Sequence, residues 1–369
     1  MKTEIIAFYL PQYHPFKEND EWWGKGFTEW TNVGKAKPLF KGHNQPRVPT
    51  ELGYYDLRLP IIREQQAQMA RDAGVTAFCY WHYWFGNGKR LIPEVFNEVL
   101  ESGKPDFPFC LGWANHSWFA KNWNSDGTTK EKLLMEQTYP GIEDEKMHFD
   151  FLIKAFRDER YVKINGKPLL YIFAPMDLPQ EYIDNFRKWT KEAGFPDIYL
   201  LANMANPKFT KEMAVKAGYQ GMVPQRLGGN PHKLEKKLDL YIRWIQRKWM
   251  FVVGFFKHRP PFMVDYSKVY HTLVKPEDMD EYIIPSIVPQ WDHTPRSGWN
   301  GTLFVNAKPE YFYEHAKEAL AIVKERKNPI IFLKSWNEWG EGNMMEPDMT
   351  YGRGFIEALK RAIIDTDSM

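Results

Sequence analysis

The stretch Thr76–Trp84 reads TAFCYWHYW and is apolar or aromatic at nearly every position. A half-exposed strand alternates apolar and polar residues, whereas a strand covered on both faces of a parallel sheet is apolar almost throughout. The stretch therefore predicts a buried parallel strand. A helical pattern follows at Pro93–Ser102. A strand followed by a helix is the repeating unit of α/β folds.

The same unit recurs along the whole chain. Eight strands are predicted, at Ile5–Pro11, Thr76–Trp84, Pro108–Asn115, Pro168–Pro175, Ile198–Ala205, Gly221–Gln225, Ile284–Asp292 and Pro329–Trp336. Helical patterns are clearest at Leu59–Ala73, Pro93–Ser102, Glu145–Asp158, Pro179–Ala193, Thr210–Ala217, Pro309–Arg326 and Arg353–Ile364. The unit after Gly221–Gln225 is the least regular, and Pro231–His258 within it fits an amphipathic helix plus an inserted loop.

Eight alternating units favour an α/β fold of the (β/α)8 TIM barrel type. The longer connections predict loop insertions near residues 12–58, 116–145 and 226–283. There are no low-complexity tracts and no linker, so we expect residues 1–369 to form a single barrel domain.

The composition narrows the classes of function and partner. The chain has 369 residues and a formal net charge of +2, so its charge gives no electrostatic case for binding nucleic acid. Its two cysteines, Cys79 and Cys110, lie in apolar runs and exclude a disulfide scaffold. No run of about 18 apolar residues occurs, which predicts no membrane span, and the N-terminus lacks a signal-peptide pattern. We therefore expect a cytoplasmic protein; the sequence does not indicate an oligomeric state.

Aromatic and polar residues gather where the predicted strands end. In a TIM barrel the functional groups lie at these ends and in the loops that follow. Sugar rings stack their apolar faces on aromatic rings and bind amides and carboxylates through their hydroxyls. We therefore predict an oligosaccharide or polysaccharide substrate. The predicted substrate-binding residues are Tyr9, Gln12, His14, Glu29, Trp30, Trp81, His82, Tyr83, Trp84, Trp113, Asn115, His116, Trp291, Asp292, Trp336 and Asn337.

The sharpest chemical signal is the pair Glu338 and Glu341 at the end of the last predicted strand. Glycoside chemistry ordinarily needs two carboxyl groups, one that donates a proton to the leaving oxygen and one that acts as base or nucleophile. Two carboxylates in a partly dry site repel each other, which raises at least one pKa and lets an acid persist near neutral pH. Their spacing lets both side chains point to one side of a turn or helix start. We predict that both are catalytic.

Signals for other chemistries are weaker. Asp278-Met279-Asp280 has the spelling of the metal-holding pair of many nucleotide-sugar glycosyltransferases, but it lies in a charged stretch and is expected to be a solvated face. No glycine-rich phosphate loop follows a predicted strand. The separations of His14, His82, His116 and His293 do not indicate a metal site. We expect no cofactor and no bound metal.

The longer motifs resemble a known family. IAFYLPQYHP, NDEWWGKGFTEWTNV, GYYDLR, FCYWHYWF, PDFPFCLGWAN and WNEWGEG look like the WbsX-like proteins of bacterial polysaccharide gene clusters, often labelled glycosyltransferases. This resemblance spans nearly the whole chain. The chain is also similar, more narrowly, to glycoside hydrolase family 99, a retaining endo-α-mannosidase family with a barrel fold. The second similarity rests mainly on WNEWGEG and the strand order.

The resemblance to family 99 implies distinct roles for the two carboxylates. Glu338 would deprotonate the sugar 2-hydroxyl to give a 1,2-anhydro intermediate, and Glu341 would protonate the leaving oxygen and then activate water. In the common retaining scheme a carboxylate instead attacks the anomeric carbon. The chain departs from its relatives at two positions: His116 stands where WbsX-like proteins commonly have Glu, and Gly340 stands where family 99 often has His.

The leading hypothesis is a retaining glycoside-cleaving enzyme that acts within a bacterial polysaccharide. Two alternatives stay open: a glycosyltransferase of lipopolysaccharide, O-antigen or capsule assembly, and a non-catalytic glycan-binding barrel, which the charge change at His116 suggests. A transglycosylating barrel would reconcile cleavage with transfer, because a sugar can replace water as the acceptor. Aromatic residues at many strand ends predict an open groove, and the run Trp22–Trp30 is expected to cover the barrel mouth.

Overall fold

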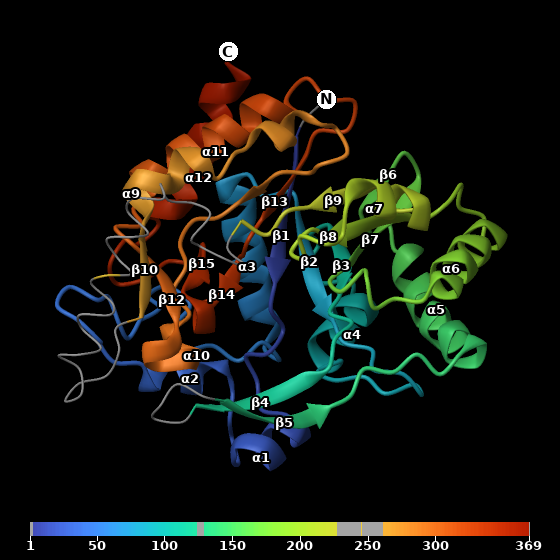
Figure 1. Cartoon of the computed structure of the whole chain (residues 1–369), viewed down its shortest axis with the longest axis horizontal. Helices are drawn as coiled ribbons and strands as arrows, with labels where there is room; N and C mark the ends of the chain where they lie inside the picture. The colour runs from blue at the N-terminus through green and yellow to red at the C-terminus, as the bar shows by residue number, and fades with distance from the viewer. Residues whose placement is uncertain (1–2, 124–128, 227–244, 246–260, 369) are drawn as a thin grey trace.

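A curled parallel sheet forms the centre of the molecule (Figure 1). The computed structural model of the chain describes residues 3–123, 129–226, 245 and 261–368. The strand order is β11-β13-β1-β2-β3-β7-β8-β9, and a parallel bridge between Met222 and Ile283 joins β9 to the segment before β11. The eight strands therefore form a nearly closed barrel, and the predicted (β/α)8 fold is confirmed. They are β1 (Glu4–Tyr9), β2 (Ala77–His82), β3 (Phe109–Trp113), β7 (Lys167–Ile172), β8 (Tyr199–Asn203), β9 (Gly221–Val223), β11 (Ser286–Ile287) and β13 (Ile330–Leu333).

Helices follow the strands and surround the barrel (Figure 1). They are α3 (Pro60–Ala73), α4 (Glu94–Ser102), α5 (Ile142–Phe156), α6 (Gln180–Glu192), α7 (Lys211–Ala217), α11 (Pro309–Val323) and α12 (Gly354–Asp367). Each coincides with a predicted helix to within a few residues. Helix α3 ends at Gly74 because this residue adopts the left-handed conformation that glycine accepts most readily. The helix expected within Pro231–His258 falls, except for Ile245, outside the described residues.

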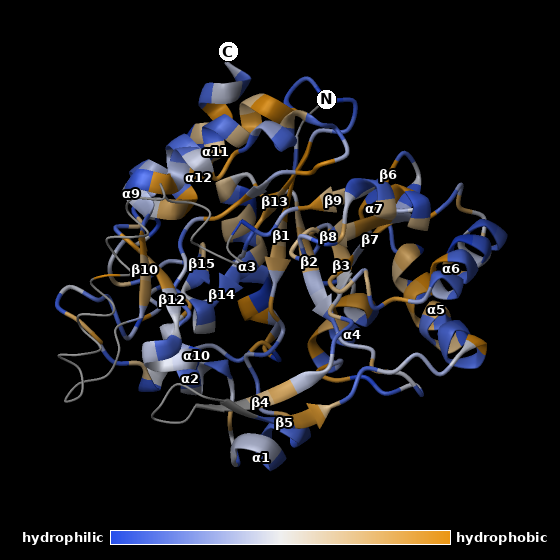
Figure 2. Ribbon diagram, viewed as in Figure 1, coloured by the Kyte–Doolittle hydropathy of each residue, from blue (hydrophilic) through white to orange (hydrophobic). Residues whose placement is uncertain are grey.

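The strands are apolar because both of their faces are covered. Ile6, Leu170 and Ile331 are fully buried, and burying a side chain of this size contributes about 1.5–3 kcal/mol. Figure 2 shows hydrophobic residues along the barrel strands and hydrophilic residues on the outer faces of the helices. Cys79 and Cys110 are buried, unbonded neighbours on β2 and β3. Among the described residues, no helix has both the length and the apolar character needed to cross a bilayer.

The inserted segments gather at the carboxyl end of the barrel strands. The first insertion contains α1 (Lys17–Trp23) and α2 (Glu29–Lys35), and the second forms a hairpin of β4 (Trp118–Trp123) and β5 (Thr129–Met135). In Figure 1 these elements and α10 (Thr294–Ser297) lie together at the bottom of the view. The smaller elements are β6 (Lys163–Ile164), β10 (Phe262–Asp265), α9 (Tyr266–Val269), η3 (Tyr270–Thr272), η4 (Pro276–Met279), η5 (Gly298–Asn300), β12 (Thr302–Val305), β14 (Asn337–Glu338), η6 (Trp339–Glu341) and β15 (Asn343–Met344).

Candidate active site

A cavity of about 750 Å³ lies where the barrel strands meet the inserted segments. Its walls come from the ends of β1, β2, β3 and β13, from α1, α2 and α10, and from the β4–β5 hairpin. The predicted site residues that line it are Gln12, Glu29, Trp81, Tyr83, His116, Trp291, Glu338 and Glu341. Both predicted catalytic carboxylates therefore face one cavity.

The loop after β13 is hydrogen-bonded on both sides of Glu338 to the segment that follows β1. The Asn337 side chain accepts a hydrogen bond from the Leu10 backbone N–H at 2.8 Å and donates to the Leu10 carbonyl at 3.0 Å. The Tyr13 hydroxyl donates to the Asn337 carbonyl at 2.6 Å and accepts from the Trp339 N–H at 2.9 Å. These four bonds hold the backbone on both sides of Glu338, so the carboxylate projects from a fixed position.

Both glycines of WGEG lie close to other side chains. A β-carbon at Gly340 would lie 2.4 Å from Glu29 Oε2 and 3.0 Å from Arg296 Nε, so these two side chains would have to shift to admit it. Gly342 has a φ of +52°, which glycine tolerates best, and a side chain there would collide with Asp292. The glycine at position 340 therefore makes room for the Glu29–Arg296 pair.

Arg296 on α10 connects three glutamates. Its guanidinium donates to Glu338 at 2.6 Å and to Glu341 at 2.5 Å, and its Nη2 lies 3.1 Å from Glu29 Oε2. Burial lowers the pKa of Arg296, but the three carboxylates outweigh burial and raise it well above its ordinary value. The arginine is therefore a permanent cation between the two predicted catalytic groups.

Asp292 positions the short helix that carries Arg296. Its Oδ1 accepts hydrogen bonds from the Thr294 N–H at 2.9 Å and the Thr294 hydroxyl at 2.6 Å. Its Oδ2 lies 2.8 Å from His43 Nε2 and accepts from Gln45 at 2.7 Å. Burial raises the pKa of Asp292, but these hydrogen bonds bring it below its ordinary value. The aspartate is buried outside the cavity lining, so we do not include it among the groups that contact substrate.

Glu338 is the more protected of the two cavity carboxylates, with 9% of its side chain exposed. Burial raises the pKa of Glu338 to about 7, since the opposing effect of Arg296 is partly cancelled by the negative charges of Glu341 and Glu29. A carboxyl group with this pKa carries a proton for much of the time near neutral pH.

Glu341 lies in a more positive environment, with 18% of its side chain exposed. Burial raises the pKa of Glu341, but Arg296, His293 and Lys334 outweigh burial and lower it below its ordinary value. His293 Nε2 is 3.9 Å from Glu341 Oε1. The two carboxyl groups therefore differ in protonation although they share one arginine.

The end of β2 divides its aromatic residues between the cavity and the protein interior. Trp81 stacks on Phe8 with ring centroids 4.9 Å apart, and Trp81 and Tyr83 line the cavity. His82 instead meets His148 of α5, with their Nε2 atoms 2.9 Å apart, and the Trp84 indole donates to Asp144. The alternation of a strand explains this division.

Several other predicted binding residues also lie away from the cavity. They are packed or hydrogen-bonded within the protein and do not line it, so we leave them out of the proposed site. Asn115 is one example: its side chain bonds the backbone of Ala174 in both directions, at 2.7 and 2.9 Å. The full set is Tyr9, His14, Trp30, His82, Trp84, Trp113, Asn115, Asp292, Trp336 and Asn337.

The Asp278-Met279-Asp280 stretch is not the solvated face that we expected. Asp278 is buried and paired with Arg226, whereas the half-buried Asp280 pairs with Lys211. Neither aspartate lines the cavity. The expectation was wrong for Asp278 because Arg226, which is distant in the sequence, neutralises it. Among the described residues, no group of three His, Cys, Asp or Glu side chains could hold a metal ion.

Sequence reasoning missed Arg296 and Lys334, and both had a detectable signal. Arg296 lies in a Thr-Pro-Arg helix start directly after the seventh predicted strand. Lys334 is the one charged residue in the apolar stretch Ile330–Trp336. Its Nζ lies 5.1 Å from the centre of the Trp291 ring at the cavity wall. A lone cation at the end of a buried strand points to the barrel mouth.

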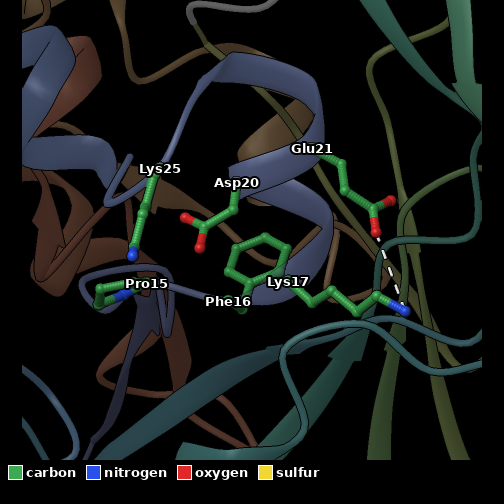
Figure 3. A pocket seen from close by; sticks show the side chains of 6 residues that line it. All are labelled: Pro15, Phe16, Lys17, Asp20, Glu21 and Lys25. Carbon is green, nitrogen blue, oxygen red and sulfur yellow. Dashed lines mark ion pairs between the residues drawn. The ribbon is translucent and has the colours of Figure 1, made fainter.

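A second hollow, of about 550 Å³, lies beside α1 and is lined by Pro15, Phe16, Lys17, Asp20, Glu21 and Lys25 (Figure 3). Its ion pair joins exposed Lys17 and Glu21 at 3.8 Å, one helical turn apart. Exposed pairs of this kind contribute little energy. Because this hollow contains no buried charged group, the larger cavity is the better candidate site.

Comparison with solved structures identifies proteins of the same fold. The family 99 endo-α-mannosidase from Bacteroides thetaiotaomicron matches with a TM-score of 0.56 and 15% identity, covering 99% of this chain and 96% of that one. A structure described as a glycoside hydrolase-like protein matches with a TM-score of 0.57 and 15% identity, covering 98% and 94%. At this level of identity the similarity shows the fold.

Comparison of sequences identifies the family. Protein WxcX, described as uncharacterised in two strains of Xanthomonas campestris pv. campestris, is 30% identical over 98% of this chain. The match covers 50% of WxcX, so the chain spans about half the length of these curated relatives. A family model described as Glycosyltransferase WbsX matches residues 5–359. The chain therefore belongs to the WbsX family.

Proposed function

We propose that the protein is an enzyme that cleaves glycosidic linkages within a bacterial polysaccharide, with Glu338 and Glu341 as its acid–base pair. The observation that carries this proposal is the arrangement of the two carboxylates, which face one cavity and share Arg296. Their pKa values are displaced in opposite directions. Such a separation suits a pair in which one group donates a proton and the other accepts one.

The electrostatics favour Glu338 as the proton donor. Glu338 enters the reaction protonated and gives its proton to the leaving oxygen, while ionised Glu341 accepts the proton of the sugar 2-hydroxyl, whose oxygen attacks the anomeric carbon to give a 1,2-anhydro ring. In the second step Glu338, now ionised, takes a proton from the water that opens this ring, and Glu341 returns its proton to the 2-oxygen, so two inversions give retention. This order is the reverse of the roles that the resemblance to family 99 implies. Arg296 then holds both carboxylates in place and limits the repulsion between them when both are ionised.

The shape and chemistry of the cavity support a sugar as substrate. Trp81, Tyr83 and Trp291 offer aromatic surface, and Gln12 offers an amide whose Nε2 donates to the Tyr83 hydroxyl at 2.8 Å. The fold shared with an endo-α-mannosidase supports an α-mannoside as the first probe. Cleavage within a chain, retention of configuration and a cytoplasmic location are further parts of the proposal.

Transfer of a sugar to an acceptor other than water is the second candidate, because the family model is described as a glycosyltransferase. A transferase that uses a nucleotide sugar should bind a nucleoside diphosphate sugar, and calorimetry with UDP- and GDP-sugars tests this directly. A glycan-binding barrel without catalysis is the third candidate. It should bind glycans equally well after either carboxylate is replaced.

The decisive experiment is a screen of polysaccharides, including α-mannans, with analysis of the products. We expect internal cleavage products of retained configuration. Glu338→Gln and Glu341→Gln should each lower the rate by about 10² or more while leaving the fold intact. A control, Asp280→Asn, removes a carboxylate outside the cavity and should leave the rate unchanged. Full activity in both glutamine variants would show that the proposed roles are wrong.

A further inference from the structure

Two adjacent tryptophans at the end of α1 have different environments. Trp22 is half-buried and packs edge-on against Trp118 of β4, with ring centroids 6.0 Å apart. Trp23 is 45% exposed and lines the mouth of the cavity. Trp22 thus joins α1 to the hairpin, whereas the exposed ring of Trp23 forgoes the stabilisation that burial would give.

The turn after Trp23 holds this ring beside a second one. Gly24 and Gly26 have φ angles of +102° and +81°, and Asp20 accepts a hydrogen bond from the Gly26 N–H at 2.8 Å. The Phe27 N–H donates to the Gly24 carbonyl at 3.2 Å. The Trp23 and Phe27 ring centroids are consequently 5.8 Å apart, with the rings tilted by 31°. The two rings are presented by an ordered turn.

A third aromatic ring reaches the same cavity from a different insertion. Phe119 on β4 is 46% exposed and lines the cavity. The neighbouring Trp118 anchors the strand, because its ring packs edge-on against Tyr83 at 5.1 Å and Phe85 at 5.9 Å. As at Trp22 and Trp23, one ring serves packing and the next is left exposed.

The exposed rings belong to the cavity that contains the carboxylates. The turn after Phe27 leads directly into α2, whose first turn is held by a hydrogen bond from the Trp30 N–H to the Thr28 hydroxyl at 3.2 Å. Glu29, which lies between Thr28 and Trp30, contacts Arg296. One short segment therefore connects Trp23 and the half-buried Phe27 to Glu29 and Arg296.

We propose that Trp23, Phe27 and Phe119 form an aromatic platform that binds a distal part of the glycan, beyond the linkage that is cleaved. This inference rests on the proposed function. The side chains of Asn19 and Asn32 line the same cavity. Aromatic rings and amides in one cavity suit sugar rings, which combine apolar faces with hydroxyl groups. The platform makes the substrate an oligosaccharide longer than a disaccharide.

The test measures how affinity depends on glycan length. Glu338→Gln serves as the parent protein to prevent turnover, and calorimetry is carried out with α-linked manno-disaccharide, tetrasaccharide and hexasaccharide. Affinity should rise with length. Adding Trp23→Ala or Phe119→Ala should weaken hexasaccharide binding about ten-fold and disaccharide binding much less. Trp23→Tyr, which keeps a ring, should retain most of the affinity. Ile142→Ala removes a hydrophobic side chain that is 62% exposed outside the cavity and serves as the control.

Three other results would contradict the platform, and one of them would also contradict the α-mannoside form of the proposed function. Equal losses at every length, or none, would overturn the platform while leaving the proposed function intact. If the parent binds no manno-oligosaccharide of any length, the α-mannoside form of the proposed function fails, and the platform fails with it. If the parent is a dimer by light scattering and Trp23→Ala makes it a monomer, the rings form an interface between two copies and the platform is wrong.

Discussion

Two buried carboxyl groups lie close together in sequence, on either side of the WGEG turn, and burial raises the pKa of each to about 7. Glu338 lines the cavity and contacts a cation, Arg296. Glu346 is 3% exposed and accepts hydrogen bonds from three neutral donors, the hydroxyl of Tyr55 at 2.9 Å, the amide of Gln66 at 2.6 Å and the indole of Trp339 at 2.6 Å.

The comparison shows that a raised pKa alone does not identify a catalytic group. The same shift arises at Glu338, which lines the cavity, and at Glu346, which is buried and does not line it. Access to the cavity and a charged partner distinguish the two. A change at Glu338 should therefore alter catalysis, whereas a change at Glu346 should alter the stability of the fold around the WGEG turn.

The largest expected effect is that of replacing Glu338, and it should depend on the leaving group of the substrate. Glu338→Gln should lower the rate on a natural glycan by about 10² or more, because the leaving oxygen then receives no proton. In a dinitrophenyl glycoside the leaving group is dinitrophenolate, which is stable without a proton. The same variant should therefore lose much less activity on this substrate. Steady-state kinetics on both substrates checks this. Equal losses on both would assign the acid role to another residue.

Replacing Arg296 should have the next largest effect. In Arg296→Met the carboxylates of Glu29, Glu338 and Glu341 lose their shared cation, so the pKa values of the catalytic pair should rise. Because Glu341 must be ionised to accept a proton, the acidic limb of the pH–rate profile should move to higher pH, and the rate at pH 7 should fall about ten-fold or more.

Arg296→Lys serves as the matched variant. It keeps the charge but not the two-pronged geometry, so its rate and pH profile should be intermediate. An unshifted acidic limb in Arg296→Met would mean that Arg296 does not set the protonation of Glu341.

Glu346→Gln should change stability more than chemistry. The NH2 group of glutamine would replace an oxygen that accepts hydrogen bonds, so it would face other donors. The unpaired donors should lower the free energy of unfolding by about 1–3 kcal/mol. The pKa of Glu346 in the folded protein is about 7, above the value of about 4.3 expected after unfolding. The wild type therefore loses stability as pH rises through this interval, whereas glutamine does not titrate, so the deficit of the variant should shrink between about pH 4 and 8.

Urea unfolding across this pH range tests the Glu346 prediction. Asp365→Asn provides a control, because the hydrogen bond from Tyr313 lowers the pKa of Asp365, so any deficit of this variant should not shrink between about pH 4 and 8. A deficit that grows with pH would show that Glu346 does not hold a raised pKa in the folded protein.

The barrel could be predicted from sequence because each strand is marked by its own apolar run and each helix by its periodicity. The location of Glu338 and Glu341 followed from their position after the last strand. The sequence could not show which residues at the end of β2 line the cavity. Alternation places Trp81 and Tyr83 on the same side of the strand but does not show which side meets the cavity. Arg296 was missed because its importance comes from contacts with residues distant in sequence, such as Glu29.

The central claim is that Glu338 and Glu341 form an acid–base pair with pKa values displaced in opposite directions. Its most direct test is a carbon NMR titration of the glutamate carboxyl groups, with assignment by Glu338→Gln, Glu341→Gln and Glu346→Gln. We expect two carboxyl groups to titrate near pH 7, one lost in Glu338→Gln and the other in Glu346→Gln, and Glu341 to titrate below its ordinary value. A bound manno-oligosaccharide should shift the titration of Glu338 but not that of Glu346. Glu338 would not be the proton donor of the pair if Glu341 titrated at higher pH than Glu338, or if no titration near pH 7 disappeared in Glu338→Gln.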